Sequence, residues 1–502
     1  MTVPGDLHVI GRMIDERARL SPTRTAIEFA DGALSYADMA SRANDLARRL
    51  LGAGLSPGDR VATLTENHPE HVVLFFACAK AGLIMAPLNW HLTAGELSEQ
   101  LAIFTPGLLV LSREQERKFA GTFPVTTHQL ETLHDDLLSA PATALPDIKD
   151  DDPVLLMATS GTTGTPKAAT LTHANCFWTN LGLDLNLPLD HDDVVLQVLP
   201  QYHVGGWNVQ PLQAWWKGAT VILEQSFSAR RALELIARRR VTTMMGVPTN
   251  YLLLSQEPGF DSADLSSLHT VIVGGAAMPP SLADLWRERG VRVAQGYGLT
   301  EASPNVCCLA PADSAQRPGS VGKPYAYVDV ALHDVVTGET VVGAGRGELW
   351  VRGPNVFAGY WQNPAATDAV VHHGWLATGD VAERDDEGFY RISGRTKEMF
   401  VSGGENVYPV EVERVLTSHA DVVDAAVVSV THPRWGESGV AFVVPRAHTH
   451  VDLEDLFRFC RVHLASFKIP SAIRIVDELP RTHIGKVDKT ALTLLAREGE
   501  ET

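Results

Sequence analysis

The feature that most constrains the fold is a repeated alternation of short apolar runs with helical patterns. Ser35 is a favoured helix-capping residue, and apolar side chains then recur every three or four positions up to Leu50. Pro69 begins a second helical pattern of this kind. Short apolar runs, each predicted to be a strand, lie at 60–64, 83–88, 194–199, 219–223 and 271–273. This rhythm predicts an α/β fold with largely parallel sheets.

The rhythm changes near residue 390. Short strands separated by glycine-rich turns are expected there, and a compact unit follows with a helix at 409–418 and a strand at 425–430. We therefore predict two domains. The first, residues 1–394, is large and built of layered α/β subdomains with mostly parallel sheets, and the second, residues 395–502, is a small mobile α+β domain.

Composition excludes several classes of function. The chain has 42 Lys and Arg against 60 Asp and Glu, a formal charge of -18, which argues against binding nucleic acid or an anionic membrane. The N-terminal residues contain no uninterrupted apolar stretch, and no run reaches the roughly 18 apolar residues of a transmembrane helix. The five cysteines form no CxxC pair. We expect a cytosolic protein with reduced, buried thiols and no transmembrane segment.

A loop rich in glycine and hydroxyl groups follows a predicted buried strand at 154–158, and Thr172 is suited to cap a helix after it. Its glycines let backbone N–H groups converge beside several hydroxyls and an ammonium, a combination suited to a polyphosphate. The loop is not a Walker A motif, because Pro166 stands where that motif has its second glycine and Ala168 follows the lysine. The residues expected to hold ATP here are Thr159, Ser160, Gly161, Thr162, Thr163, Gly164 and Lys167.

A second segment, Gln295-Gly-Tyr-Gly-Leu-Thr-Glu301, offers groups for the rest of a nucleotide. Tyr297, between two glycines, presents a flat face for adenine, and Thr300 has a hydroxyl for the α-phosphate. Glu301 provides the hard oxygen ligand that Mg²⁺ takes on a polyphosphate. The spacing is not Gly-x-Gly-x-x-Gly, so a dinucleotide site is not indicated.

Further motifs follow in order along the chain. Leu199–Gly206 presents His203 before two glycines, and Val271–Pro279 is an apolar strand running into a double glycine, a position where open α/β sheets bind ligands. In Thr378-Gly-Asp380 the carboxylate suits two ribose hydroxyls, and Arg395 is placed to reinforce it. In Leu479–Lys486 a glycine stands directly before Lys486, which indicates an exposed turn that presents the Lys486 ammonium.

Together these motifs resemble, in order and over nearly the whole chain, the adenylate-forming superfamily of acyl- and aryl-CoA synthetases, nonribosomal adenylation domains and beetle luciferases. The resemblance implies that Lys486, His203, Thr300 and Glu301 are catalytic, and that Glu301 and Thr159 meet Mg²⁺ on the ATP phosphates. It implies a hinge at 395–397, with Lys397 at its centre. It extends the ATP and AMP contacts to Gly275, Ala276, Gln295, Gly296, Tyr297, Gly298, Asp380 and Arg395.

The acyl-CoA branch of the family suggests two further sets of residues. Gly403, Gly404, Trp435, Phe467 and Lys468 would lie along coenzyme A. The acyl pocket would be lined by Trp207, Asn208, Met245, Gly246, Thr249, Gly274 and Asn305. These mainly apolar or small residues favour a fatty or aryl acid, although Arg230 and Arg231 leave a malonate-like acid open.

The predicted function is ATP-dependent ligation of a small carboxylic acid to coenzyme A through an acyl adenylate, by a monomer or homodimer. One alternative is a freestanding adenylation enzyme that loads a carrier protein, because only about sixteen residues follow Lys486. An inactive nucleotide sensor is the alternative from a different class. The predicted catalytic residues are all present, which disfavours it.

Overall fold

The computed structural model describes residues 8–30, 32–119, 121–159, 166–396, 398–402, 405–432, 436–447, 449, 451–482 and 486–498. The chain divides into two compact units, one of Met1–Val330 with Val351–Ala377 and one of Ala331–Trp350 with Thr378–Thr502. The division falls within strands β17 (Gly345–Arg352) and β20 (Trp375–Arg384). A hinge at 395–397 stays a prediction, and Lys397 lies outside the described residues.

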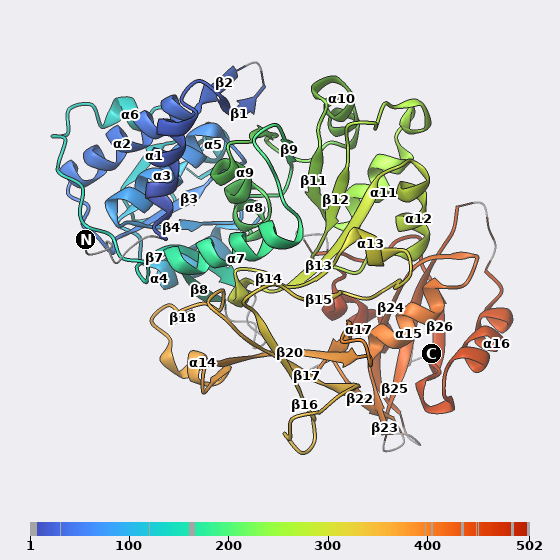
Figure 1. The fold of residues 1–502 in the computed structure, drawn as a ribbon. Coiled ribbons are helices and arrows are strands. Elements are labelled where there is room, and N and C mark those ends of the chain that lie inside the picture. Colours follow the sequence, from blue (N-terminus) through green and yellow to red (C-terminus); the bar gives the residue numbers. More distant parts are fainter. Residues whose placement is uncertain are drawn as a thin grey trace. The chain divides into compact units, whose positions relative to one another are not determined.

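The first unit contains a nine-stranded sheet, visible in Figure 1, in which the predicted parallel arrangement is found. Strands β13, β12, β11, β9, β10 and β1 are parallel neighbours in that order, and β14 and β15 continue the sheet antiparallel beyond β13. The strands are β1 (Thr25–Phe29), β2 (Gly32–Ser35), β9 (Val194–Gln197), β10 (Thr220–Leu223), β11 (Thr243–Gly246), β12 (Thr270–Val273), β13 (Arg292–Gly298), β14 (Asn305–Leu309) and β15 (Lys323–Pro324).

Helices cover this sheet because their apolar side chains are stabilised by burial against it. Helices α10 (Ala229–Arg239), α11 (Pro248–Gln256) and α12 (Pro280–Glu288) bury their apolar residues with those of the strands in one core. Trp286 of α12 is fully buried there, with its ring centroid 5.4 Å from that of Tyr251. The parallel strands therefore keep their carboxyl ends, where the predicted motifs lie, on a rigid base.

A second, seven-stranded sheet carries the predicted phosphate loop. Its order is β18-β8-β7-β4-β3-β5-β6, and β7 and β8 form an antiparallel hairpin. The strands are β3 (Arg60–Leu64), β4 (Ile84–Pro87), β5 (Leu108–Leu111), β6 (Thr127–Gln129), β7 (Pro153–Thr159), β8 (Lys167–Thr172) and β18 (Gly359–Tyr360). Helix α3 (Pro69–Ala81), which is buried from His71 onward, lies between β3 and β4 in the chain.

Local signals in the sequence placed several elements correctly. Ser35 and Thr172 each form a capping box, at the starts of α2 (Tyr36–Gly52) and α7 (His173–Asn186). The strand predicted at 60–64 is found with those bounds. Strand β8 was not predicted. The glycine-rich loop joins the antiparallel strands β7 and β8, and helix α7 begins only after β8. Nearly every residue of β8 is buried, so the alternation of polar and apolar residues that marks a strand is absent.

The second unit has its own sheet, β23-β22-β25-β24, with β26 beside β25. Its strands are β22 (Phe400–Ser402), β23 (Glu405–Val407), β24 (Val422–His432), β25 (Gly436–Pro445) and β26 (Ala472–Ile475), and its helices are α15 (Pro409–Thr417), α16 (Leu453–His463) and α17 (Lys489–Glu498). Apolar clusters lie in this unit around Val427 and around Phe442. The α/β class with a large N-terminal and a small C-terminal part is confirmed.

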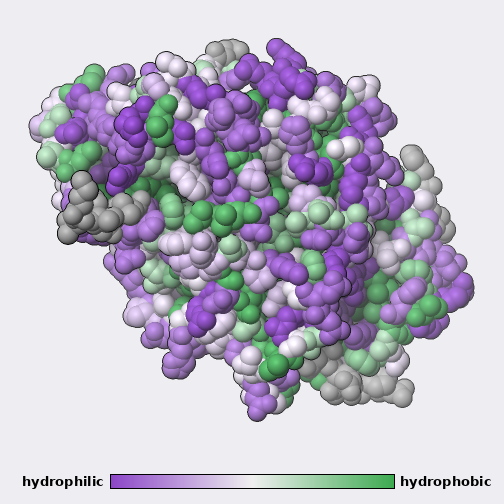
Figure 2. Space-filling view, in the orientation of Figure 1, coloured by the Kyte–Doolittle hydropathy of each residue, from purple (hydrophilic) through white to green (hydrophobic). Residues whose placement is uncertain are grey.

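The surface and the thiols agree with the composition. All five cysteines are free and buried. The face shown in Figure 2 is mainly hydrophilic, with hydrophobic residues in small separate patches. Among the described helices, none combines the length and the apolar character needed to cross a bilayer.

His71 of α3 is a buried polar residue whose two ring nitrogens both have partners. Its Nδ1 lies 3.0 Å from Gln201 Oε1 and its Nε2 lies 2.9 Å from Thr63 Oγ1. The side chain is almost fully enclosed, and this burial lowers the pKa of His71 to about 3. The neutral ring suits the network, because Nδ1–H then donates to the amide oxygen and Nε2 accepts from the hydroxyl.

We expect His71 to make folding sensitive to mild acid. Its folded pKa lies below the unfolded value of 6.5, so the unfolded chain binds the proton and stability is lost as the pH falls below 6.5. Between pH 7 and pH 5 the wild type should lose about 2 kcal/mol of unfolding free energy more than His71→Gln. Urea unfolding of both proteins at both pH values measures this, and equal losses would contradict it.

Candidate functional site

The described flanks of the phosphate loop bring its two ends together. Thr159 ends β7 and is paired with Lys167 at the start of β8, and the Thr159 hydroxyl donates to the Lys167 carbonyl oxygen at 3.5 Å. The hairpin thus closes the loop from both sides. The predicted contacts Ser160, Gly161, Thr162, Thr163 and Gly164 lie outside the described residues.

Thr300 and Glu301 lie on a short 3-10 turn, Thr300–Ala302, directly after β13. Glycine is required at Gly298, because a Cβ there would lie 1.5 Å from the Pro304 carbonyl oxygen. The turn packs against β8, and the N–H of Phe357 donates to the Glu301 carbonyl oxygen at 2.9 Å. Glu301 and Lys167, predicted separately from two motifs, are therefore neighbours in one region of the first unit.

Tyr360 contacts both of these residues and was not predicted. Its hydroxyl donates to Glu301 Oε1 at 2.8 Å, and Lys167 Nζ lies 4.8 Å from its ring centroid. Burial and the neighbouring Glu301 carboxylate raise the pKa of Tyr360, so the phenol keeps its proton. No sequence pattern indicates this contact, because Tyr360 follows Glu301 by 59 positions and stands outside the predicted motifs.

The turn after β12 is held from below by Gln295 of β13. The Gln295 amide donates to the carbonyl oxygens of Val273 and Ala276, at 3.2 and 3.1 Å, and accepts from the Met278 N–H at 3.0 Å. Gln295 is 8% exposed, so its side chain supports the turn, whereas Gly275 and Ala276 are exposed on it. Tyr297, two positions along β13, is partly exposed, as a contact for adenine requires.

Buried polar side chains also fix the segment that presents His203. Asn67 accepts from the Gln201 N–H at 2.9 Å and donates to the Leu199 carbonyl oxygen at 3.0 Å. His71 binds the Gln201 side chain from the same side. His203 itself is partly exposed, with its ring 4.6 Å from that of Tyr202. The segment is therefore a supported turn with one histidine at its surface.

The predicted acyl-pocket residues are all described, and they fall into two groups. Trp207 and Asn208 are fully buried; the Trp207 ring packs against that of Phe75 at 4.6 Å, and its indole N–H donates to the Gln201 carbonyl oxygen. Met245, Gly246 and Gly274 stand at the ends of β11 and β12, where Asn305 begins β14, and Thr249 is exposed on α11.

Gly274 and Met245 touch across the ends of their strands. A Cβ on Gly274 would lie 2.6 Å from Met245 Cε, so any larger residue at position 274 would displace the flexible end of the methionine side chain. Met245 belongs to a buried apolar cluster, which comprises Leu183, Val209, Met245, Ile272, Cys308 and Tyr325. This end of the sheet is suited to an apolar group.

In the second unit, Asp380 and Arg395 pair as the sequence suggested. They are opposite each other in strands β20 and β21 (Tyr390–Arg395), and Arg395 Nε donates to Asp380 Oδ1 at 2.9 Å. Asp380 is 6% exposed, whereas Arg395 is exposed. The guanidinium therefore stabilises a mostly buried carboxylate, and a role of this pair in ribose binding stays a prediction.

Lys486 is exposed, and described residues on either side of it are paired through their backbones. The Thr482 N–H donates to the Lys486 carbonyl oxygen at 2.7 Å, and Arg481 and Val487 form an antiparallel bridge beside it. Of the predicted coenzyme A contacts, Phe467 is half-buried and Lys468 donates to the buried Glu411 at 2.6 Å. Gly403, Gly404 and Trp435 lie outside the described residues.

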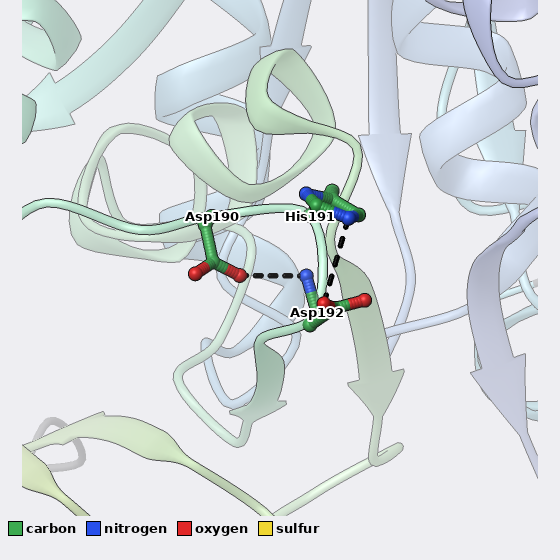
Figure 3. Close-up of side chains that lie close together, drawn as sticks. All are labelled: Asp190, His191 and Asp192. Carbon is green, nitrogen blue, oxygen red and sulfur yellow. Dashed lines mark hydrogen bonds and ion pairs between the residues drawn. The ribbon is translucent and has the colours of Figure 1, made fainter.

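Within the described part of the chain, one group of side chains has the spacing of a metal site: Asp190, His191 and Asp192 (Figure 3). All three are exposed, and Asp190 Oδ1 accepts from the Asp192 N–H at 2.7 Å within the same turn. The cluster is a hydrogen-bonded surface turn before β9, and we assign it no metal.

Comparison with known proteins identifies the family of the chain. The family model described as AMP-binding enzyme matches residues 14–361, and that of the AMP-binding enzyme C-terminal domain matches residues 411–486. A feruloyl-CoA synthase of Amycolatopsis sp is 40% identical over 94% of this chain and 96% of its own. An indoleacetate–CoA ligase of Aromatoleum aromaticum is 36% identical over 96% of each chain.

Solved structures show the same likeness. The o-succinylbenzoate CoA synthetase of Bacillus subtilis, in complex with its acyl-adenylate intermediate, has a TM-score of 0.87 at 31% identity, covering 96% of this chain and 97% of that one. The ATP-bound MatB of Rhodopseudomonas palustris has a TM-score of 0.89 at 32% identity, covering 97% and 98%. The predicted resemblance is confirmed: the chain belongs to the AMP-binding enzyme family and, within it, to the AMP-forming acid–CoA ligases.

Proposed function

We propose that this ligase activates an aromatic carboxylic acid as its acyl adenylate and transfers the acyl group to coenzyme A. The observation that supports an aromatic substrate is the buried apolar cluster around Met245, whose side chain ends beside Gly274. The relatives described above, named for feruloyl, indoleacetate and o-succinylbenzoate, are consistent with such an acid.

A malonate-like acid is disfavoured by the surroundings of the two arginines that suggested it. Arg230 Nε lies 3.9 Å from Glu257, and Arg231 Nε lies 3.5 Å from Glu224. The Arg230 side chain is 76% exposed on α10. Each guanidinium thus has a carboxylate partner on the protein itself and does not need one from a substrate.

The first half-reaction joins two anions, so charge neutralisation and positioning dominate it. A carboxylate oxygen of the acid attacks the α-phosphorus of ATP, the bond to the bridging oxygen breaks, and pyrophosphate leaves. Lys167 faces the β- and γ-phosphates, Thr300 donates to the α-phosphate, and Lys486 neutralises the attacking carboxylate. Asp380 holds the ribose, with Arg395 as its partner.

Glu301 fits a magnesium ion on these phosphates. Its carboxylate supplies the oxygen ligands that Mg²⁺ prefers, and Oε1 is already oriented by the Tyr360 hydroxyl. No described residue donates a hydrogen bond to Oε2. When bound, Mg²⁺ would neutralise charge on the departing pyrophosphate. In the second half-reaction the sulfur of coenzyme A attacks the acyl carbonyl carbon, the mixed anhydride bond breaks and AMP leaves.

Acid-dependent release of pyrophosphate from ATP is the direct test of this function. A panel should include cinnamate-type, arylacetic, fatty and dicarboxylic acids, each assayed with and without coenzyme A. We expect the highest kcat/KM with an aromatic acid and thioester formation only with coenzyme A. If none of the acids in the panel causes release of pyrophosphate, the result would instead support an inactive nucleotide sensor.

Replacing Lys486 should separate the half-reactions. An ammonium about 4 Å from an anion is worth roughly 4 kcal/mol at an effective dielectric of 20, so Lys486→Ala should slow adenylate formation about a thousandfold. Thioester formation from a supplied acyl adenylate should be spared. Lys149→Ala, which removes a surface lysine paired with Asp147 in the first unit, is the matched control. Equal loss of both half-reactions would contradict the role of Lys486.

Enlarging Gly274 should act on the acid and leave ATP binding unchanged. The new methyl group of Gly274→Ala would displace the end of the Met245 side chain within the proposed acyl pocket, so kcat/KM for aromatic acids should fall about tenfold while the KM for ATP is unchanged. Adding Met245→Ala should restore space and much of the activity. If the kinetic constants for ATP and for the acid changed to the same extent, Gly274 would not be a specific part of the acid pocket.

We also propose that the residues around 395–397 act as the hinge between the half-reactions. The basis is the family resemblance, since Arg395 ends β21 and Lys397 follows two positions later. Lys397→Pro fixes the backbone φ angle, so adenylate formation should persist while thioester formation slows at least about tenfold. Single-turnover measurements of each step check this, and an unchanged overall rate would contradict it.

A further inference from the structure

Tyr360 is held in place by the backbone on both sides of it. It pairs with Ala169 of β8, and its neighbours Ala358 and Trp361 donate N–H groups to β8 at 3.0 and 2.8 Å. Its own N–H donates to the Thr367 hydroxyl at 2.9 Å. The position of its side chain is thereby determined by the same strand that begins at Lys167.

The side chain of Tyr360 contacts two groups of opposite charge. Its hydroxyl donates to Glu301 Oε1 at 2.8 Å, and the Lys167 ammonium lies over its ring at 4.8 Å from the centroid. The ring also packs edge-on against Phe357, with centroids 5.0 Å apart. Lys167 and Glu301, both within the described residues, form no ion pair with each other.

This arrangement keeps an ammonium and a carboxylate close together without a direct ion pair between them. A lysine for the phosphates and a carboxylate for their metal must lie close together, and if they paired directly each would be neutralised by the other. An aromatic face attracts the ammonium weakly, and a phenol O–H orients one carboxylate oxygen without adding charge. The two groups can then each bind their own part of a magnesium–ATP complex.

We propose that Tyr360 is a positioning residue that orients Glu301 toward Mg²⁺ and keeps Lys167 separate from it for the phosphates of ATP. The inference rests on the proposed function, because it assigns Glu301 and Lys167 to bound ATP and its metal. Residues that orient a metal ligand commonly change metal affinity 10- to 100-fold when replaced, so the effect should be measurable.

The test separates the hydroxyl from the ring. Tyr360→Phe keeps the face under Lys167 and loses only the hydrogen bond to Glu301. With Mn²⁺ as the probe, electron paramagnetic resonance should show binding to the protein–ATP complex weakened about tenfold, while metal-free ATP binding by calorimetry stays within about twofold. Tyr360→Leu also loses the ring, so metal-free ATP binding should weaken a further two- to fivefold, about the strength of an exposed cation–π contact.

A matched control removes another buried tyrosine hydroxyl from the same unit. Tyr36 donates to the Ala219 carbonyl oxygen at 2.5 Å and has no part in the proposed site. Tyr36→Phe should leave Mn²⁺ binding unchanged, even if it lowers the melting temperature as much as Tyr360→Phe does. Equal Mn²⁺ affinities in the wild type, Tyr36→Phe and Tyr360→Phe would overturn the proposal, as would weakening of metal-free ATP binding by Tyr360→Phe to the same extent as metal binding.

A double variant tests whether Tyr360 acts through Glu301. In a Glu301→Gln background, Tyr360→Phe should change Mn²⁺ affinity no further, and additive losses would contradict the coupling. Failure of the proposed function would appear separately, as a wild-type protein that binds ATP and Mn²⁺ but releases no pyrophosphate with any acid.

Discussion

The pairing of β8 with β7 on one side and β18 on the other is the constraint on which the nucleotide end of the site depends. It pairs Thr159 with Lys167, the two residues that flank the predicted phosphate loop, and it sets Tyr360 opposite Ala169. The turn that carries Glu301 packs against the same strand. One short strand therefore determines where three polar side chains meet, although they come from segments far apart in the sequence.

Across the first unit, the residues that face outward are held by buried polar residues behind them. Gln295 supports the turn after β12, and Asn67 supports the segment that presents His203. Such buried networks are costly when incomplete, because each unpaired group would lose its hydration without replacement. The bonds that Gln295 and Asn67 make to the backbone give these segments the rigidity that a positioned nucleotide requires.

The sequence predicted what is coded locally and missed what is decided by long-range pairing. Helix caps at Ser35 and Thr172 were found from residue type and spacing alone. Glu301 and Asp380 were proposed from their motifs, and Arg395 is indeed beside Asp380. Strand β8, buried on both faces, has no alternation to read, and β18 is only two residues long, too short for any pattern. Tyr360, which depends on both strands, could not be found without them.

The net charge of -18 is also compatible with a substrate that is itself a polyanion. Charges separated by more than about 8 Å of saline are largely screened, so the local groups decide binding. Near β8 those groups are the ammonium of Lys167, the neutral phenol of Tyr360 and a carboxylate whose charge suits a divalent cation. An acidic surface can therefore coexist with tight binding of magnesium–ATP, provided that a neutral side chain keeps the cation and the carboxylate from pairing with each other.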